Sequence, residues 1–117
     1  MREINRSMLI PKPRAAFFAW IQSLETENGT YTLDELREDC AALLVPEMDE
    51  PDDVDAFIAE YHEPLFEYLL AEWADDPALW PEQRDLETLR DWFDFEVSTL
   101  VFDVCDWALE HVEEPED

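Results

Sequence analysis

Glycine is nearly absent, since Gly29 is the single glycine among 117 residues. Loops that hold a phosphate or a dinucleotide need several glycines, because backbone N–H groups must approach the ligand closely. The Gly-x-Ser-x-Gly turn that presents a nucleophilic serine is also missing. The sequence therefore excludes a P-loop, a dinucleotide-binding loop and a hydrolase nucleophile turn.

Cysteine and histidine are scarce, with two of each. Cys40 and Cys105 are too few for a disulfide scaffold, so we expect two mostly buried free thiols, although one bridge between them stays open. His62 and His111 stand among acids, but no Cys-x-x-Cys, His-Glu-x-x-His or calcium-loop pattern is present. The acids are too numerous for any pair to identify an acid–base site. We expect no metal, no cofactor and no catalytic residue, and hence no enzyme.

Long apolar runs are missing as well. No stretch approaches the roughly 18 apolar residues of a membrane span. After the basic N-terminus, Pro11 and Pro13 interrupt the apolar run before it reaches the length of a signal peptide. The sequence predicts a cytoplasmic protein that does not associate with membranes.

Positive charge is the largest shortage: seven Lys and Arg face 32 Asp and Glu, for a net charge of −25. Four of the basic residues, Arg2, Arg6, Lys12 and Arg14, precede Ala15, so the remainder is more acidic still. We expect these four side chains to lie against acidic surface of this chain or of a second subunit, or to be merely solvated. Nucleic-acid binding needs Lys and Arg to neutralise phosphates, so direct binding to nucleic acid is not expected. A basic protein is the expected partner, and the oligomeric state stays open.

Apolar and aromatic residues are plentiful, at 47% and 13% of the chain. A disordered acidic chain would be poor in aromatics, and a chain of this length buries well over half of its surface when it folds. We expect residues 1–117 to form a single domain, with residues 110–117 as a frayed acidic tail.

The order of patterns predicts an α+β fold, with a small sheet of about three strands and about four helices packed on it. The short apolar run at 7–10 predicts a strand that ends at Pro11 and Pro13. A second strand is expected at 42–46, although Ala and Leu also favour a helix there. Residues 97–104 are rich in β-branched and aromatic residues and predict a strand, expected to be central and to pair with at least one of the other two.

Helices are expected where apolar residues recur at a spacing of three and four. A Thr32–Glu35 capping box opens one near Leu33, and Pro64 is expected to kink or restart another. Residues 77–85 should form a loop held by Trp80, Asn28-Gly29 a turn, and Trp107 and Leu109 the start of a C-terminal helix. The four expected helices are 14–24, one from Leu33, one from Pro51 to about Trp73, and 86–93 with Asp85 as its cap.

Four motifs resemble a group of small bacterial proteins to which no activity has been assigned. They are Ile4-Asn5-Arg6-Ser7, Leu9-Ile10-Pro11-Lys12-Pro13, Trp92-Phe93 and Val101-Phe102-Asp103. The resemblance covers most of the chain. It implies a bacterial cytosolic origin and a compact mixed fold, and it supplies no functional residues.

Three hypotheses account for the charge. The first is an interaction protein that recognises a basic partner by electrostatic complementarity. A second is a DNA mimic that occupies a nucleic-acid-binding protein, since spaced carboxylates can imitate the roughly 1.7 Å charge spacing of duplex DNA. Salt adaptation without a specific role is the third. An exposed Trp rimmed by acids can anchor a cationic partner, so the candidate partner-binding residues are Trp80, Trp107, Asp52, Asp53, Asp55, Asp75 and Asp76.

Overall fold

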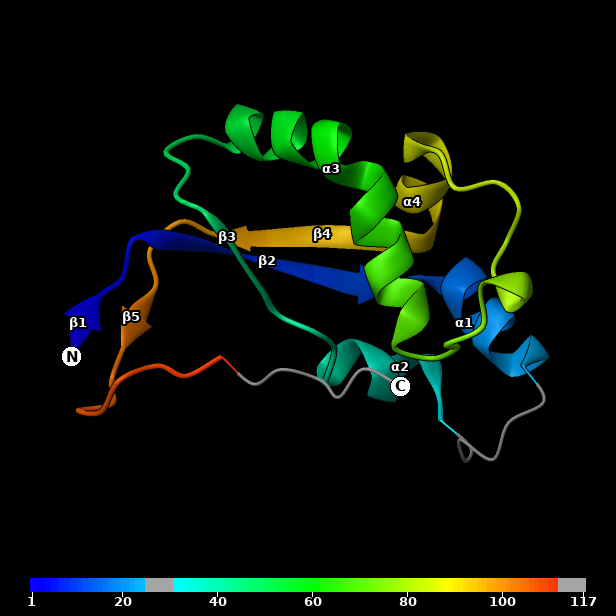
Figure 1. The fold of residues 1–117 in the computed structure, drawn as a ribbon, viewed down its shortest axis with the longest axis horizontal. Coiled ribbons are helices and arrows are strands. Elements are labelled where there is room, and N and C mark those ends of the chain that lie inside the picture. Colours follow the sequence, from blue (N-terminus) through cyan, green and yellow to red (C-terminus); the bar gives the residue numbers. More distant parts are fainter. Residues whose placement is uncertain (25–30, 112–117) are drawn as a thin grey trace.

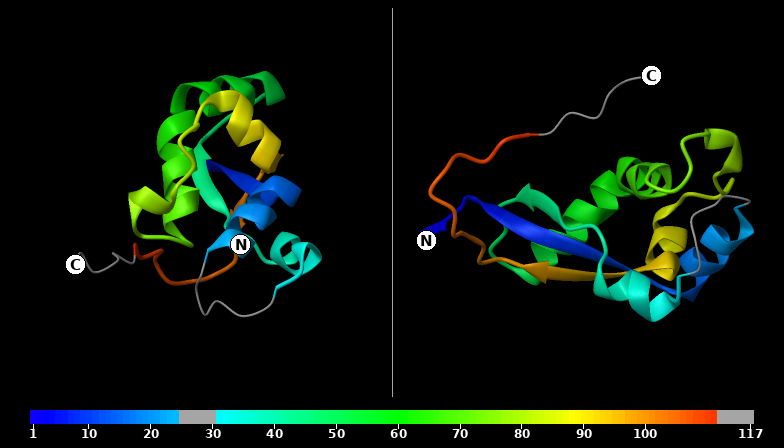
Figure 2. Two further views of the ribbon diagram at one scale, coloured as in Figure 1. Left: turned by 90° about the vertical axis from the view of Figure 1, so that its right-hand side faces the viewer. Right: turned by 90° about the horizontal axis from the view of Figure 1, so that it is seen from below.

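The computed structural model describes residues 1–24 and 31–111, and Figures 1 and 2 show its arrangement. The expected Asn28-Gly29 turn and the last part of the acidic tail lie outside the described residues. In chain order the elements are β1 (Arg2–Glu3), β2 (Arg6–Pro13), α1 (Ala15–Ser23), α2 (Leu33–Glu38), β3 (Leu43–Pro46), α3 (Pro51–Ala71), the 3₁₀ turn η1 (Pro77–Leu79), α4 (Leu86–Trp92), β4 (Phe93–Ser98) and β5 (Phe102–Asp103).

The strands form two antiparallel sheets, one of three strands in the order β3-β2-β4 and one of two strands, β1-β5. The predicted α+β class is confirmed. The central strand is β2, at the N-terminus, so the prediction of a central strand at 97–104 is wrong. Helices α3 and α4 lie on one side of the larger sheet, while α1 and α2 lie at the end where β2 leads into α1 (Figures 1 and 2).

Strand β2 continues through Pro11 and Pro13, so the prediction that these prolines end it is wrong. β3 pairs with β2 only as far as Leu9, and the stretch that holds both prolines therefore has a neighbour on one side only. The backbone N–H of Arg14 donates to the carbonyl of Trp92 on the other side (2.8 Å). Because backbone groups alternate sides along a strand, both prolines face away from β4. Their missing N–H removes no ladder hydrogen bond, and sheets tolerate proline at such positions.

Strand β4 begins directly after α4 and covers 93–98 rather than 97–104. Phe93, Phe95 and Val97 lie opposite Pro13, Pro11 and Leu9 and point to the core face, while the alternate residues are acids and a serine. This period of two is the ordinary strand pattern. The predicted pairing of this region with 7–10 is confirmed at Val97 and Ser98.

Beyond β4 the two chain segments stay paired as a narrow ribbon. Glu3 lies opposite Phe102, and the N–H of Ile4 donates to the carbonyl of Val101 (2.9 Å). Between the two sheets, residues 4–7 face the shorter segment 99–101, and the extra residue interrupts the ladder as a bulge does. Ribbon β1–β5 therefore projects from the body of the molecule (Figure 1).

The helices largely follow the sequence signals. The Thr32–Glu35 capping box is formed at α2, and the carboxylate of Asp85 accepts from the backbone N–H of Thr88 at the start of α4 (2.8 Å). Helix α3 spans the region predicted as one interrupted helix, and its kink appears as non-helical backbone angles at Tyr61. The kink follows from proline three residues later, because the ring lacks an N–H and clashes with the preceding turn.

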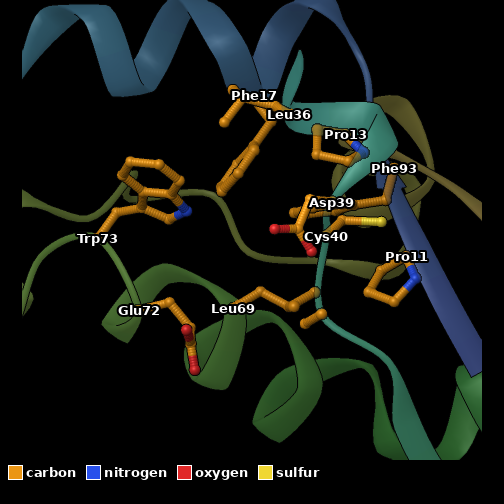
Figure 3. A pocket seen from close by; sticks show the side chains of 11 residues that line it. Pro11, Pro13, Phe17, Leu36, Asp39, Cys40, Leu69, Glu72, Trp73 and Phe93 are labelled. Atoms are coloured by element: carbon orange, nitrogen blue, oxygen red, sulfur yellow. The ribbon is translucent and has the colours of Figure 1, made fainter. Parts of the chain in front are cut away.

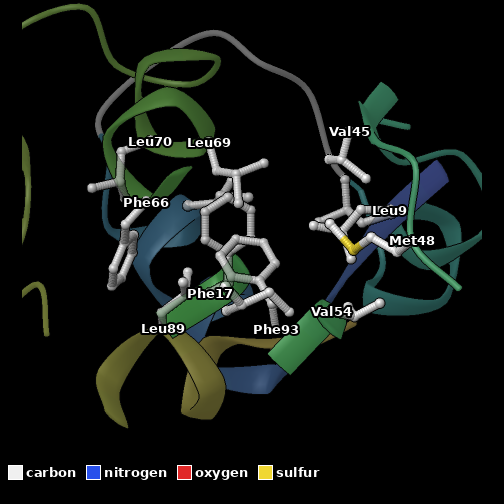
Figure 4. Packing of buried hydrophobic residues seen from close by; sticks show 13 residues of the cluster. Leu9, Phe17, Val45, Met48, Val54, Phe66, Leu69, Leu70, Leu89 and Phe93 are labelled. Carbon is white, nitrogen blue, oxygen red and sulfur yellow. The ribbon is translucent and has the colours of Figure 1, made fainter. Parts of the chain in front are cut away.

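The core lies between the three-stranded sheet and the helices, as Figure 4 shows. Phe93 of β4 packs on Phe17 of α1 with ring centroids 4.6 Å apart, and Phe66 of α3 packs on Trp92 at 5.4 Å. Ser7 of β2 is a buried polar side chain, and its hydroxyl accepts from the backbone N–H of Met48 (2.9 Å). These contacts join α1 to β4, α3 to α4, and the segment after β3 to the central strand. Elements α3 and β3 line the site described next.

Candidate functional site

The five predicted acidic residues lie in two groups at opposite ends of α3. Asp52, Asp53 and Asp55 are in the first two turns of this 21-residue helix, and Asp75 and Asp76 follow its C-terminus. All five side chains are exposed. The structure does not bring the two groups together, so they do not form one cluster.

Three of these acids have partners within the protein. Asp53 accepts from the backbone N–H of Glu50 (3.3 Å), and Asp76 accepts from the N–H of Ala78 (3.0 Å). Asp55 forms an ion pair with Arg90 (3.4 Å). The side chains of Asp52 and Asp75 have no such partner among the described residues.

The two predicted tryptophans differ in role. Trp80 is half-buried against the core and its indole N–H donates to the carbonyl of Ala74 (2.8 Å), with the Arg84 guanidinium 5.8 Å from the ring. It therefore anchors the 77–85 loop, as expected. Trp107 is 71% exposed in a segment without helix or strand, and Val104 and Leu109 of the same segment are exposed as well. The helix predicted to begin here is not formed within the described residues, which end at His111.

All seven basic side chains interact with the chain itself. Arg14 (3.8 Å) and Arg37 (3.2 Å) both form ion pairs with Asp94 of β4. Arg37 also donates to the carbonyl of Pro13 (2.8 Å). Of the four N-terminal basic residues, Arg14 thus meets an acid. The others donate to oxygens of the chain itself: Arg2 to Cys105, Arg6 to Asn5 and Lys12 to Arg37.

The segment from Glu38 to Gln83 contains no Lys or Arg. It includes β3, α3 and η1, and every acidic side chain of α3 is exposed apart from the half-buried Glu67. Among the described residues, Asp55 is the one carboxylate of this segment that forms an ion pair, with Arg90, so the negative charge of the segment has little internal compensation. We call this part of the molecule the acidic half.

An apolar groove crosses the acidic half, between β3 and the kinked part of α3. Its volume is about 290 Å³, and no charged side chain lines it: the lining is Leu43, Leu44, Val45, Phe57, Tyr61, Pro64, Leu65 and Tyr68. The rings of Phe57 and Tyr61 lie 4.7 Å apart. Leu44, Tyr61 and Tyr68 are exposed. Sequence reasoning missed this groove, although Pro64 in an aromatic-rich helix signalled the kink that bounds it.

A second, acidic hollow adjoins the groove at Tyr68. It has a volume of about 250 Å³ and is lined by Tyr68, Ala71, Glu72 and Asp75. Because Tyr68 lines both hollows, an apolar surface passes directly into one that carries two carboxylates. Asp75 is thus the one of the five predicted acidic residues that lines this hollow.

A third pocket, of about 280 Å³, lies beside the prolines of β2 (Figure 3). Among residues 1–24 and 31–111, no strand pairs with β2 on that side of the prolines. Glu72 lines both this pocket and the acidic hollow. The half-buried thiol of Cys40 borders it, with Sγ 3.9 Å from the Arg37 carbonyl. Its lining contains two carboxylates, from Asp39 and Glu72, but no histidine, serine or lysine. This set provides a small acidic recess without a nucleophile–base pair.

Among residues 1–24 and 31–111, no three His, Cys, Asp or Glu side chains converge where they could hold a metal ion. None of the described helices combines the length and apolar character needed to cross a bilayer. Within the described part of the chain, one carboxyl group has a displaced pKa: hydrogen bonds from the Thr88 side chain and then from Gln83 lower the pKa of Asp85 from 3.8 to about 2. That shift belongs to the cap of α4 and marks no reactive site.

Comparison with known proteins gave no match among protein families, curated proteins or solved structures. The resemblance suggested by the four motifs therefore stays a prediction.

Proposed function

We propose that this is a non-enzymatic cytoplasmic protein that binds a basic protein partner through its acidic half. The observation that carries the proposal is the separation of charge. The basic side chains interact within the fold, whereas Glu38 to Gln83 holds no basic residue. A surface of one sign attracts partners of the opposite sign from a distance and repels similar surfaces.

Apolar surface within the acidic half supports binding rather than solubility alone. Tyr61 and Tyr68 are exposed on the same helix as the acids. Exposed aromatic side chains are enriched at protein interfaces, where they contribute much of the binding energy. Charge would then guide the encounter, and aromatic contacts would hold the complex.

The test is capture of partners from the native host by immobilised protein, followed by mass spectrometry, at about 0.05 M and about 0.5 M monovalent salt. We expect retained proteins to be basic and to be lost at high salt, because screening shortens the reach of charge to a few Å. A variant with four α3 carboxylates replaced should retain less of them. Retention of acidic and basic proteins alike, or retention insensitive to salt, would contradict the proposal.

Displacement by DNA separates this proposal from its sharper form. If the captured partner binds either duplex DNA or this protein, but never both, the acidic half acts as a DNA mimic. If the partner, duplex DNA and this protein form a ternary complex, this protein binds the partner at a surface other than its DNA-binding site. If nothing basic is retained and salt only raises the melting temperature, salt adaptation explains the charge.

A further inference from the structure

We propose that the apolar groove receives an extended segment of the basic partner, which pairs with the free edge of β3 and places a Lys or Arg in the hollow of Glu72 and Asp75. This inference rests on the proposed function and specifies its binding site. It follows from the backbone of β3, the lining of the groove and the position of the acids.

Strand β3 presents backbone hydrogen-bonding groups on its outer side. The even-numbered residues of β2 direct their backbone groups toward β4, as the hydrogen bond from Arg14 to Trp92 shows. Leu44 lies opposite one of them, Met8. In such a pair each residue directs its N–H and C=O away from the other. The N–H and C=O of Leu44 therefore face outward, and in the described part of the chain no further strand pairs with β3 on that side.

The groove runs along this same edge. Side chains of successive strand residues point to opposite faces, yet Leu43, Leu44 and Val45 all line the groove. A hollow that touches three consecutive residues must lie beside the backbone. An extended segment placed there would bond to Leu44 by strand addition, a common mode of peptide recognition. Every second side chain would point toward Phe57 and Tyr61.

The acidic hollow sets the position of the positive charge. The pocket beside β2 is lined by Cys40 and Ala41, which precede β3. It is also lined by Leu69 in the last turn of α3 and by Glu72, the residue that follows this helix. The C-terminal end of α3 therefore lies near the start of β3. A Lys or Arg next to the Leu43 end of the added segment would reach the two carboxylates beyond Tyr68.

A second copy of this chain is a poor occupant of the groove. Each copy carries a net charge of −25, and like charges oppose association. The edge is only four residues long and ends in Pro46, a feature that limits pairing between identical edges. A cationic segment meets neither obstacle. Its charge is opposite to that of the protein, and the outward N–H and C=O of Leu44 are enough to set its register beside β3.

The probe is a blocked octapeptide of alternating lysine and valine, titrated into the full chain with fluorescence anisotropy as the readout. Two peptides serve as controls, one of alternating lysine and serine and one of alternating glutamate and valine. We expect the lysine–valine peptide to bind at least about tenfold more tightly than either control. Equal affinity of the two lysine peptides would overturn the proposal, because the groove would then contribute nothing.

Amide hydrogen exchange locates the contact. The Leu44 amide should exchange rapidly in the free protein and slow by about tenfold or more with the lysine–valine peptide. The Val45 amide faces β2 and should be protected in both states, which makes it the internal control. Unchanged exchange at Leu44 with bound peptide would contradict strand addition.

Variants test the two halves of the site separately. Leu44→Pro removes the outward N–H. Should this variant fold poorly, Tyr61→Ser with Tyr68→Ser removes the aromatic lining of the groove instead. Each change should abolish the preference for the lysine–valine peptide over the lysine–serine peptide. Glu72→Gln with Asp75→Asn should weaken the peptide by about fivefold. The charge-matched control, Glu87→Gln with Asp91→Asn on α4, should leave its affinity within about twofold. Equal losses in both charge pairs would overturn the assigned hollow.

The outcomes distinguish failure of this inference from failure of the proposed function on which it rests. If basic host proteins are retained but Leu44 stays unprotected, the groove proposal fails while binding of a basic partner stands. If no basic protein or peptide binds, both fail. A doubled mass in light scattering, with Leu44 protected in the absence of peptide, would assign the groove to a second copy and overturn the inference.

Discussion

The acidic half and the remainder of the molecule use charge in opposite ways. Outside the acidic half, Arg14 and Arg37 converge on Asp94 and tie the start of α1 and the end of α2 to β4. Within it, α3 exposes acids that are separated from any basic residue in sequence. Net charge alone therefore does not predict how a given carboxylate affects stability. A carboxylate can stabilise one region through an ion pair and repel neighbouring acids in another.

The largest contrast lies within α3 itself, between its buried and exposed sides. Phe66→Ala removes a fully buried ring that packs on Trp92, so the free energy of unfolding should fall by about 3–5 kcal/mol. Tyr68→Ala, two residues away and 60% exposed, should change it by less than about 0.5 kcal/mol. Urea unfolding followed by circular dichroism measures both. Similar losses would show that the exposed side also carries the fold.

The next largest loss of stability is expected on replacement of Arg37. Arg37→Ala removes the bond to the Pro13 carbonyl and the ion pair with Asp94, and it should lower the free energy of unfolding by about 1–2 kcal/mol. Arg6→Ala is the control, because Arg6 bonds to its neighbour Asn5. An Arg6 effect as large as that of Arg37 would contradict the distinction drawn between basic residues.

Removal of the same charge at two places should have opposite signs. Asp94→Asn loses two exposed ion pairs and should destabilise by less than about 1 kcal/mol. Glu63→Gln relieves repulsion from Glu60 and Glu67, one turn away on either side, and should raise the free energy of unfolding by a few tenths of a kcal/mol. Both differences should shrink as salt rises. Melting temperatures at low and high salt test this, and a common sign would refute it.

The pH-dependent effect concerns the cap of α4. The pKa of Asp85 is lowered to about 2 in the folded protein, below its usual 3.8, so its stabilising charge is fully present above pH 3.8 and is lost as pH falls through about 2. Asp85→Ala should lower the melting temperature by a few degrees at pH 7. The gap to the unsubstituted protein should narrow at pH 2. Asp75→Ala, which removes no cap, should show no gap at either pH.

Local signals predicted most of the helices and failed for two strands. The Thr32–Glu35 box and the kink before Pro64 depend on near neighbours, and both are confirmed. The path of β2 through Pro13 depends on where β3 stops, which no local pattern reveals. The alternation from Phe93 to Ser98 was visible, but the helical pattern that precedes it concealed where the strand begins.

The candidate site was predictable only in part, because it is made by tertiary contacts. The acids at both ends of α3 were identified from composition and capping, and Asp75 does border the acidic hollow. The groove joins Leu43–Val45 to side chains as distant as Tyr68. Its formation depends on how α3 crosses the edge of the sheet, and that crossing follows from core packing around Phe66.

The central claim is that a basic partner binds the acidic half in particular, and one comparison tests it directly. Partner capture is measured with two variants of equal charge and matched chemistry, each with four Glu→Gln substitutions at exposed or half-exposed positions. The first changes Glu60, Glu63, Glu67 and Glu72 within the acidic half, and the second changes Glu3, Glu87, Glu96 and Glu110 outside it. We predict that the first variant loses most of the captured basic protein and that the second keeps it. Equal loss in both would show that total charge, rather than the acidic half, determines binding, and would contradict the account.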